Sequence, residues 1–271
     1  MKPRLKVVML SDIIPLMDSD PARVEYLKQI VKNSGSIRNP LSLAMVSKNR
    51  FLLLEDSSIM EALNLLRIEH VPAQVIPCRK TLKFTADITA GQVSLADLKT
   101  FSGLFPRAFY QPPAELPDEY TARCTQVKIS KKDKPDIRIY FMKDDSAHLP
   151  PAIFTFLDYL KKCWSFCNNC HPARVRPVNV KGESDDSWSL SVINIGVADL
   201  RFASDHGFLF PPRMLRFNSG HRIIGIDYPI DVLREHVPIG QKEQFLHDLV
   251  NMRLNGGFSE YIKSGVVLLN Y

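Results

Sequence analysis

Residues 51–66 constrain the fold more than any other stretch, because they join a short apolar run, a polar turn and an amphipathic segment. The run 51–54 (FLLL) has the length and composition of a buried strand, and the acidic and hydroxyl residues of 55–58 (EDSS) interrupt it. Apolar residues then recur at three-residue spacing over 60–66, which predicts a helix that the turn can cap. A strand–turn–helix of this kind directs free backbone N–H groups at the space above the turn, so it can bind an anion.

The flanking residues predict more strands and a second helix. We expect strands at 5–10, 41–46 and 70–76, and a helix over 22–33. Asp20 is a good N-cap for that helix, Pro21 suits its first position, and Gly35 lies close to its end. The alternation of strands and helices predicts an α/β protein.

Three segments carry a resemblance to a known family. They are 20–46 (DPARVEYLKQIVKNSGSIRNPLSLAMV), the strand–turn–helix with its continuation HVPAQVI, and 211–233 (PPRMLRFNSGHRIIGIDYPIDVL) followed by 245–253 (FLHDLVNMR). Together they resemble the ParB/sulfiredoxin-like fold, and within it the free L-serine kinases, including the kinase encoded in staphyloferrin B siderophore clusters. The resemblance implies a ParB/sulfiredoxin-like N-terminal unit with a C-terminal α+β portion.

The turn departs from the motif of that family. The family has Asp-Gly-x-His-Arg there, where Gly admits phosphate groups and His and Arg contact them. The resemblance aligns Glu55 with Asp, Asp56 with Gly, Ser58 with His and Ile59 with Arg. Two carboxylates repel nucleotide phosphates, and the guanidinium that would neutralise them is missing. The sequence therefore implies the kinase scaffold with a degenerate nucleotide site.

Two aspartates are candidates for a catalytic base. The resemblance places Asp18 and Asp20 near the glutamate with which the family removes the proton from the serine hydroxyl. Asp20 is also expected to cap a helix, and this role alone accounts for a short acidic side chain at that position. If the protein is a kinase, its catalytic base is therefore Asp18 or Asp20. If it is not, Asp20 serves only to cap the helix.

Three arginines in the matched segments can form an anion site. Arg38 precedes Asn39-Pro40, and Arg216 and Arg222 flank the sequence NSGH at 218–221, which predicts a β-hairpin. Guanidinium groups bind phosphate and carboxylate through paired N–H groups, so we expect these arginines to converge on an anionic ligand. The full set of expected ligand-binding residues is Arg38, Glu55, Asp56, Ser57, Ser58, Arg216 and Arg222.

A cluster of cysteines, Cys163, Cys167, Cys170 and the adjacent His171, can bind a metal or haem. The spacing resembles that of radical cluster enzymes, but too few residues follow for their barrel. The end of the cluster resembles a c-type haem attachment sequence, which requires export. Three thiolates and His171 can hold zinc or iron, and one of these side chains can be an axial haem ligand. Alternatively, Cys163 and Cys167 lie on one helix face and pack in the core.

The rest of the chain predicts a second domain. We expect strands at 126–129, 137–142, 187–195 and 197–202, and an aromatic-rich helix over 153–165. Residues 86–205 lie outside the resemblance, and the composition shifts to aromatic residues and proline over 100–117. We therefore expect a ParB/sulfiredoxin-like domain over 1–85 and an α+β domain over 86–271.

The composition limits the location and the partners. With 45% hydrophobic and 24% charged residues, no run of 18 apolar residues and no signal-peptide pattern at the start, the sequence predicts a cytoplasmic protein without a membrane partner. The net charge of +6 permits an anionic metabolite or nucleotide as ligand. It indicates nucleic-acid binding only weakly, because no dense basic cluster appears.

Three functions agree with these observations. The first is a regulatory or accessory protein of a specialised-metabolite (siderophore-type) pathway, with a degenerate nucleotide site. The second is an active kinase that transfers phosphate from ATP or ADP to L-serine with Mg²⁺. The third, a DNA-binding regulator, follows only from the analogy with ParB.

Overall fold

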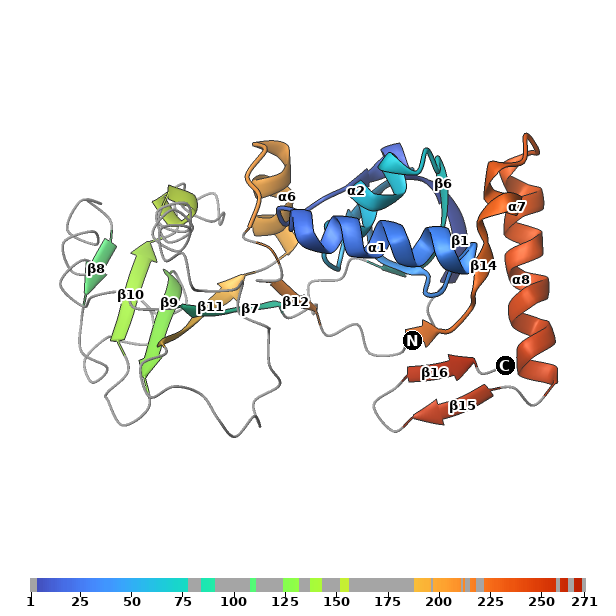
Figure 1. Ribbon diagram of the computed structural model, residues 1–271. Coiled ribbons are helices and arrows are strands. Elements are labelled where there is room, and N and C mark those ends of the chain that lie inside the picture. The colour runs from blue at the N-terminus through green and yellow to red at the C-terminus, as the bar shows by residue number, and fades with distance from the viewer. Residues whose placement is uncertain are drawn as a thin grey trace. The chain divides into compact units, whose positions relative to one another are not determined.

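The computed structural model divides the chain into two compact units (Figure 1). One unit combines Met1–Leu82 with Asn218–Tyr271, and the other is Lys83–Phe217. This division differs from the expected domains 1–85 and 86–271, because the C-terminal segment packs on the N-terminal sheet. The structure describes residues 4–77, 84–90, 108–110, 124–131, 137–142, 152–155, 188–195, 197–210, 212, 215–217, 222–256, 259–262 and 266–269.

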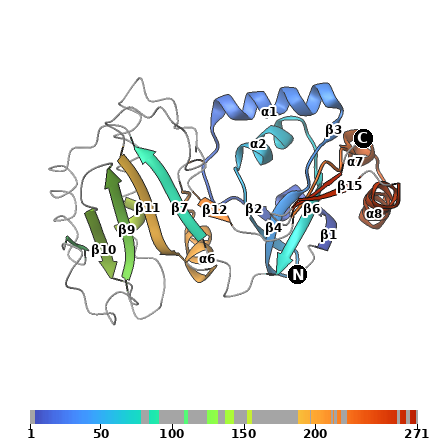
Figure 2. The ribbon, with the colours of Figure 1, turned by 90° about the horizontal axis from the view of Figure 1, so that it is seen from below.

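The discontinuous unit contains a five-stranded mixed sheet with the order β1-β6-β4-β5-β2 (Figure 2). The outer strand β1 is antiparallel to β6, β6 is parallel to β4, and β4 is antiparallel to β5. All four long strands expected from the sequence are confirmed. The strands of this sheet are β1 (Arg4–Met9), β2 (Ile13–Ile14), β4 (Leu41–Ser47), β5 (Arg50–Leu53) and β6 (His70–Pro77), with the 3₁₀ turn η1 (Leu10–Asp12) between β1 and β2.

Two helices, α1 (Pro21–Ser34) and α2 (Ser58–Leu65), pack against each other on one side of this sheet (Figure 2). The predicted caps of α1 are confirmed. The Asp20 carboxylate accepts hydrogen bonds from the backbone N–H groups of Ala22 (3.1 Å) and Arg23 (3.4 Å). Gly35 ends the helix at φ 63°, a left-handed conformation that glycine adopts without steric cost.

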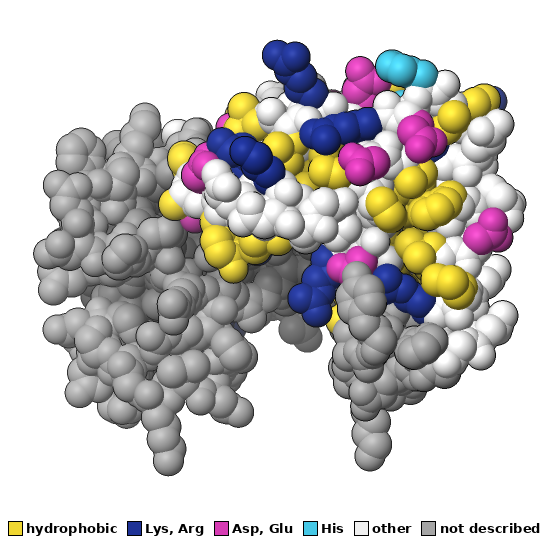
Figure 3. Space-filling view, turned by 45° about the vertical axis from the view of Figure 1, so that its right-hand side comes forward, with side chains coloured by type: hydrophobic (Ala, Val, Ile, Leu, Met, Phe, Trp, Pro, Cys, Tyr) yellow, Lys and Arg dark blue, Asp and Glu magenta, His cyan; other side chains and the backbone are white. Residues whose placement is uncertain are grey.

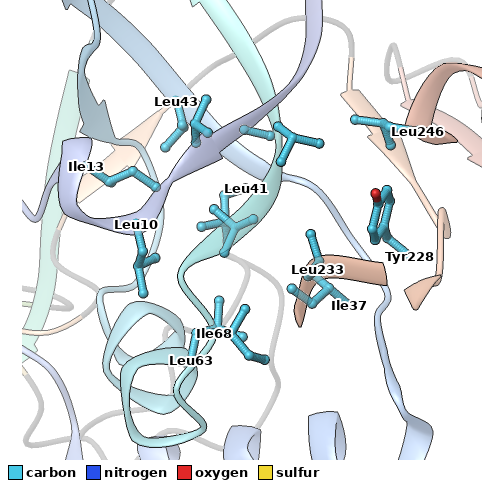
Figure 4. Packing of buried hydrophobic residues seen from close by; sticks show 14 of the residues in the cluster. Leu10, Ile13, Ile37, Leu41, Leu43, Leu63, Ile68, Tyr228, Leu233 and Leu246 are labelled. Atoms are coloured by element: carbon cyan, nitrogen blue, oxygen red, sulfur yellow. The ribbon is translucent and has the colours of Figure 1, made fainter. Parts of the chain in front are cut away.

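The C-terminal segment completes the core of the same unit. Strand β14 (Tyr228–Pro229) pairs with β3 (Ser36–Ile37), and α8 (Ile239–Asn255) packs on β1. Short helix α7 (Ile230–Arg234) and strands β13 (Arg222–Ile224), β15 (Ser259–Ile262) and β16 (Val266–Leu269) complete the segment. Figure 4 shows Tyr228, Leu233 and Leu246 near Ile37 and Leu41. Residues far apart in the sequence therefore share one apolar core.

The second unit is built on a six-stranded antiparallel sheet with the order β12-β7-β11-β9-β10-β8. The predicted strands at 126–129, 137–142 and 187–195 are confirmed as parts of this sheet. Its strands are β7 (Phe84–Ala90), β8 (Ala108–Tyr110), β9 (Cys124–Lys131), β10 (Ile137–Met142), β11 (Trp188–Ile195) and β12 (Leu215–Phe217). The mixed α/β class expected from the sequence is confirmed.

Two local predictions are wrong. Residues 197–202 belong to helix α6 (Val197–Asp205) and not to a strand, since Leu200 and Ala203 lie three residues apart and are both fully buried, as helical spacing allows. The strands that flank 218–221 do not form a hairpin, because β12 pairs with β7 whereas β13 pairs with β16. Of the helix expected over 153–165, residues 152–155 are described and helical, and the rest lies outside the described residues.

Candidate functional site

Four polar side chains meet where β4, β6 and β13 approach the turn after β5. We call this set, Ser42, Glu55, Gln74 and Arg222, the polar junction. Glu55 accepts a hydrogen bond from the Ser42 backbone N–H, and Arg222 Nη2 lies 3.5 Å from its Oε1. The Ser42 hydroxyl accepts from Arg222 and from Gln74, both at 2.9 Å, and Gln74 Oε1 accepts from the Ile223 N–H at 2.9 Å. The junction therefore connects the C-terminal segment to the N-terminal sheet.

Glu55 is an acidic side chain in an unfavourable place for its charge. Burial raises the pKa of this carboxyl, and the charge of Arg222 and the hydrogen bonds from Ser42 lower it by less. Neighbouring Asp56 raises the pKa further. Glu55 thus holds its proton more firmly than an exposed glutamate.

Asp56 caps α2 and bonds to α1 at the same time. Its Oδ1 accepts from the Ser58 N–H (2.9 Å) and from the Ser58 hydroxyl (2.7 Å), and its Oδ2 forms an ion pair with Arg23 Nε at 2.7 Å. Within the turn that the sequence predicts as a cap, Asp56 is therefore the residue whose side chain accepts from the start of the helix. Ser57 is the N-cap residue, but its buried hydroxyl has no hydrogen-bond partner among the residues that the structure describes.

Ser58 links the turn to the loop before α1. Its fully buried hydroxyl accepts a hydrogen bond from the Asp20 N–H at 2.9 Å. The structure thus brings the backbone of a predicted catalytic residue to the turn, while the Asp20 carboxylate caps α1. Asp18, the other predicted base, is half-buried in the same loop.

Of the three arginines expected to converge, only Arg222 is described at the turn. The Arg38 side chain is exposed, and its backbone carbonyl accepts from the Asp227 N–H. Arg216 is on β12 in the other unit, and its side chain lies outside the described residues. Arg253 on α8 is buried and bonds to Asp227 and to the Gly225 carbonyl, so it stabilises the C-terminal segment.

Three residues of the site are not among those expected from the sequence, namely Arg23, Ser42 and Gln74. Ser42 and Gln74 are polar residues inside otherwise apolar strand segments, LSLAMV and HVPAQVI. A buried polar side chain requires a hydrogen-bond partner, so each was a detectable sign of a polar cluster. Arg23 gives no comparable sign, because an arginine in the first turn of a helix is usually exposed.

The metal prediction concerns a different part of the chain. Within the described ranges, no three His, Cys, Asp or Glu side chains are grouped as a metal site would require. Cys163, Cys167, Cys170 and His171 lie outside the described residues.

Among the helices that the structure describes, none has both the length and the apolarity to cross a membrane. On the face shown in Figure 3, basic, acidic and apolar side chains are interspersed.

Comparisons with solved structures show that other proteins share this fold. SbnI with C-terminal truncation from Staphylococcus aureus aligns with a TM-score of 0.65 at 18% identity, over 91% of this chain and 96% of that chain. A free serine kinase in complex with AMP aligns with a TM-score of 0.54 at 11% identity, over 86% and 95%. A conserved hypothetical protein from Pyrococcus furiosus aligns with a TM-score of 0.51 at 10% identity, over 86% and 98%.

These likenesses extend over most of each chain and show a common fold. No protein-family model matches the sequence, and no curated protein matches it. The fold is therefore that of SbnI and the free serine kinases, as the sequence resemblance led us to expect. At these identities the comparison gives the scaffold and leaves the activity to be inferred from the site.

Proposed function

We propose that the protein is a regulatory or accessory member of a specialised-metabolite pathway of the siderophore type, built on a free-serine-kinase scaffold without kinase activity. One observation carries this proposal. The carboxylate of Asp56 is bonded to the first turn of α2 and to Arg23, where a strand–turn–helix would otherwise present donors to an anion.

The charges around the turn support the loss of phosphoryl transfer. Such a transfer depends mostly on positioning the phosphates and neutralising their charge. Here Arg23 pairs with Asp56, and Arg222 lies beside Glu55. The aliphatic side chain of Ile59 cannot replace the guanidinium of the kinase motif.

A nucleotide or another small anionic metabolite is the best candidate ligand. Free serine kinases of the same fold have been solved in complex with AMP and with ADP. We infer that this protein keeps a ligand-binding role on that scaffold and that binding, and not turnover, is its contribution to the pathway.

An active serine kinase is the second candidate, and the bond between the Asp20 N–H and the Ser58 hydroxyl favours it. This bond brings the acidic loop beside the turn, as a kinase that uses Asp18 or Asp20 as its base would require. Mg²⁺ would then bridge and neutralise the phosphates of ATP or ADP. The capping role of the Asp20 carboxylate argues against that residue as the base.

The test is a direct assay of phosphoryl transfer. Purified protein is incubated with L-serine, Mg²⁺ and either ATP or ADP, and O-phospho-L-serine is measured by mass spectrometry. We expect no product above a protein-free control. Product that is abolished by Asp18→Asn or Asp20→Asn would establish the second candidate. Asn is a suitable replacement at residue 20 because it keeps a capping oxygen.

A further inference from the structure

The start of α2 holds an anion that belongs to the chain itself. Both oxygens of the Asp56 carboxylate are engaged, one by the Ser58 N–H and hydroxyl and the other by Arg23. A helix N-terminus and a guanidinium are both groups with which proteins hold a phosphate. Here they hold a carboxylate instead.

The surroundings of this carboxylate allow exchange with a ligand. The side chain of Arg23 is 37% exposed and that of Asp56 is 15% exposed, so the pair is partly accessible to solvent, with the Arg23 Nε atom itself buried. Ion pairs that solvent can reach are weak. A dianionic group that also bonds to the helix start can therefore compete for Arg23.

Ser57 provides an observation that is independent of the ion pair. Its residue is 5% exposed, and its hydroxyl oxygen has no hydrogen-bond partner among the described residues. A buried hydroxyl without a partner is costly. Ser57 is the N-cap residue of α2, so its hydroxyl lies at the same helix start and can donate a hydrogen bond to a bound anion.

We propose that Asp56 is an internal, displaceable ligand that closes an anion site formed by the start of α2, the Ser57 hydroxyl and Arg23. A phosphate group, either free or as part of a nucleotide, binds there when the Asp56 carboxylate leaves. This inference rests on the proposed function, since it describes how ligand binding by a non-catalytic protein is controlled.

Displacement of Asp56 has a consequence for α1. The Ser58 hydroxyl bonds both to Asp56 and to the Asp20 N–H, and Arg23 lies in the first turn of α1. An anion that takes over Arg23 and the helix start changes the partners of the loop before α1. The state in which Asp56 fills the site and the state in which an anion fills it therefore differ in the contacts of the loop before α1.

The experiment measures anion binding by isothermal titration calorimetry, with inorganic phosphate and ADP as separate probes. The proteins are the wild type, Asp56→Asn, Asp56→Gly and the double variant Asp56→Asn/Arg23→Gln. Asn keeps an oxygen for the Ser58 N–H and loses only the charge, and Gly removes the whole side chain. Glu61→Gln is the matched control, because Glu61 is an exposed acidic residue in the first turn of the same helix.

We expect both Asp56 variants to bind at least one probe about tenfold more tightly than the wild type. The added Arg23→Gln change should abolish the gain, and Glu61→Gln should not produce one. A gain for both probes would identify phosphate itself as the ligand group, whereas a gain for ADP alone would identify a nucleotide.

Affinities of the Asp56 variants within about twofold of the wild type would overturn the proposal, as would an equal gain in Glu61→Gln. This outcome differs from failure of the proposed function. The latter fails if the wild type forms O-phosphoserine, whatever the Asp56 variants bind.

Discussion

At the scale of single residues, the fold changes the protonation of the Glu55 carboxyl in the turn after β5. Its burial raises the pKa above the ordinary value of 4.5, in spite of Arg222 and Ser42. The folded chain therefore binds this proton more tightly than the unfolded chain does. The stability that follows is fully present below about pH 4.5 and is lost as the pH rises through the raised pKa.

We therefore expect Glu55→Gln to stabilise the protein at neutral pH, on the order of 1 kcal/mol. Glutamine keeps an oxygen for the Ser42 N–H and removes the charge of a partly buried side chain that is 28% exposed, and Arg222 stays partly solvated with its side chain 39% exposed. The measurement is the free energy of unfolding in urea at several pH values between about 4.5 and 8.

The advantage of Glu55→Gln should shrink toward the acid end of that range. Glu61→Gln is the control for a general effect of charge, since Glu61 is exposed on α2. Parallel stability curves for the wild type and Glu55→Gln would show that the Glu55 carboxyl does not titrate as burial requires.

At the scale of elements, α8 is held to the sheet through a buried lysine. Lys242 Nζ donates to the Leu233 carbonyl at 2.6 Å and lies 3.4 Å from His70 Nδ1, at the start of β6. Burial and the positive charge of Lys242 lower the pKa of His70 below 6.5, and Glu69 opposes them. Because the folded state disfavours a protonated His70, this group lowers stability as the pH falls below about 6.5.

We expect His70→Gln to lose less thermal stability than the wild type when the pH is lowered from about 7.5 to about 5.5. Glutamine can accept a hydrogen bond from Lys242 but does not titrate. The measurement is Tm by circular dichroism at each pH.

The control for this change is His247→Gln, since His247 is an exposed histidine on α8. It should follow the wild-type curve. If His70→Gln also follows that curve, the pair of His70 and Lys242 does not set the acid stability of the α8 contact.

At the scale of the whole molecule, the first unit is discontinuous in the sequence. Residues after 217 provide a large part of its core, in addition to strand β14 and the contacts of the polar junction. Burial of each large apolar side chain stabilises a fold by about 1.5–3 kcal/mol. The apolar side chains of the C-terminal segment in this core are Ile226, Tyr228, Ile230, Leu233, Leu246 and Val250.

We therefore expect residues 1–85 expressed alone to lack a cooperative thermal transition. A chain that joins 1–82 to 218–271 through a flexible linker should fold, because it restores the complete core. Circular dichroism melts and the dispersion of amide NMR signals distinguish the two cases. A cooperative transition of 1–85 by itself would contradict the discontinuous unit.

The sequence by itself determined the features that depend on neighbouring residues. Asp20, Pro21 and Gly35 define α1 because caps act within one helical turn. The long strands of the first sheet also depend on neighbouring residues, since each of them coincides with a short apolar run. At the site, the departure of residues 55–59 from the kinase motif was visible in the sequence, because it depends on residue identity alone.

Only the tertiary structure decided which of these residues meet. Asp56 pairs with Arg23, and Arg222 with Ser42 and Glu55, across long stretches of chain. No periodicity encodes such pairs, since they arise from how the sheet and the C-terminal segment pack. The same packing placed 197–202 in a helix and separated the strands on either side of 218–221. Local propensity is a weak preference that burial of apolar surface overrides, so these features required the folded molecule.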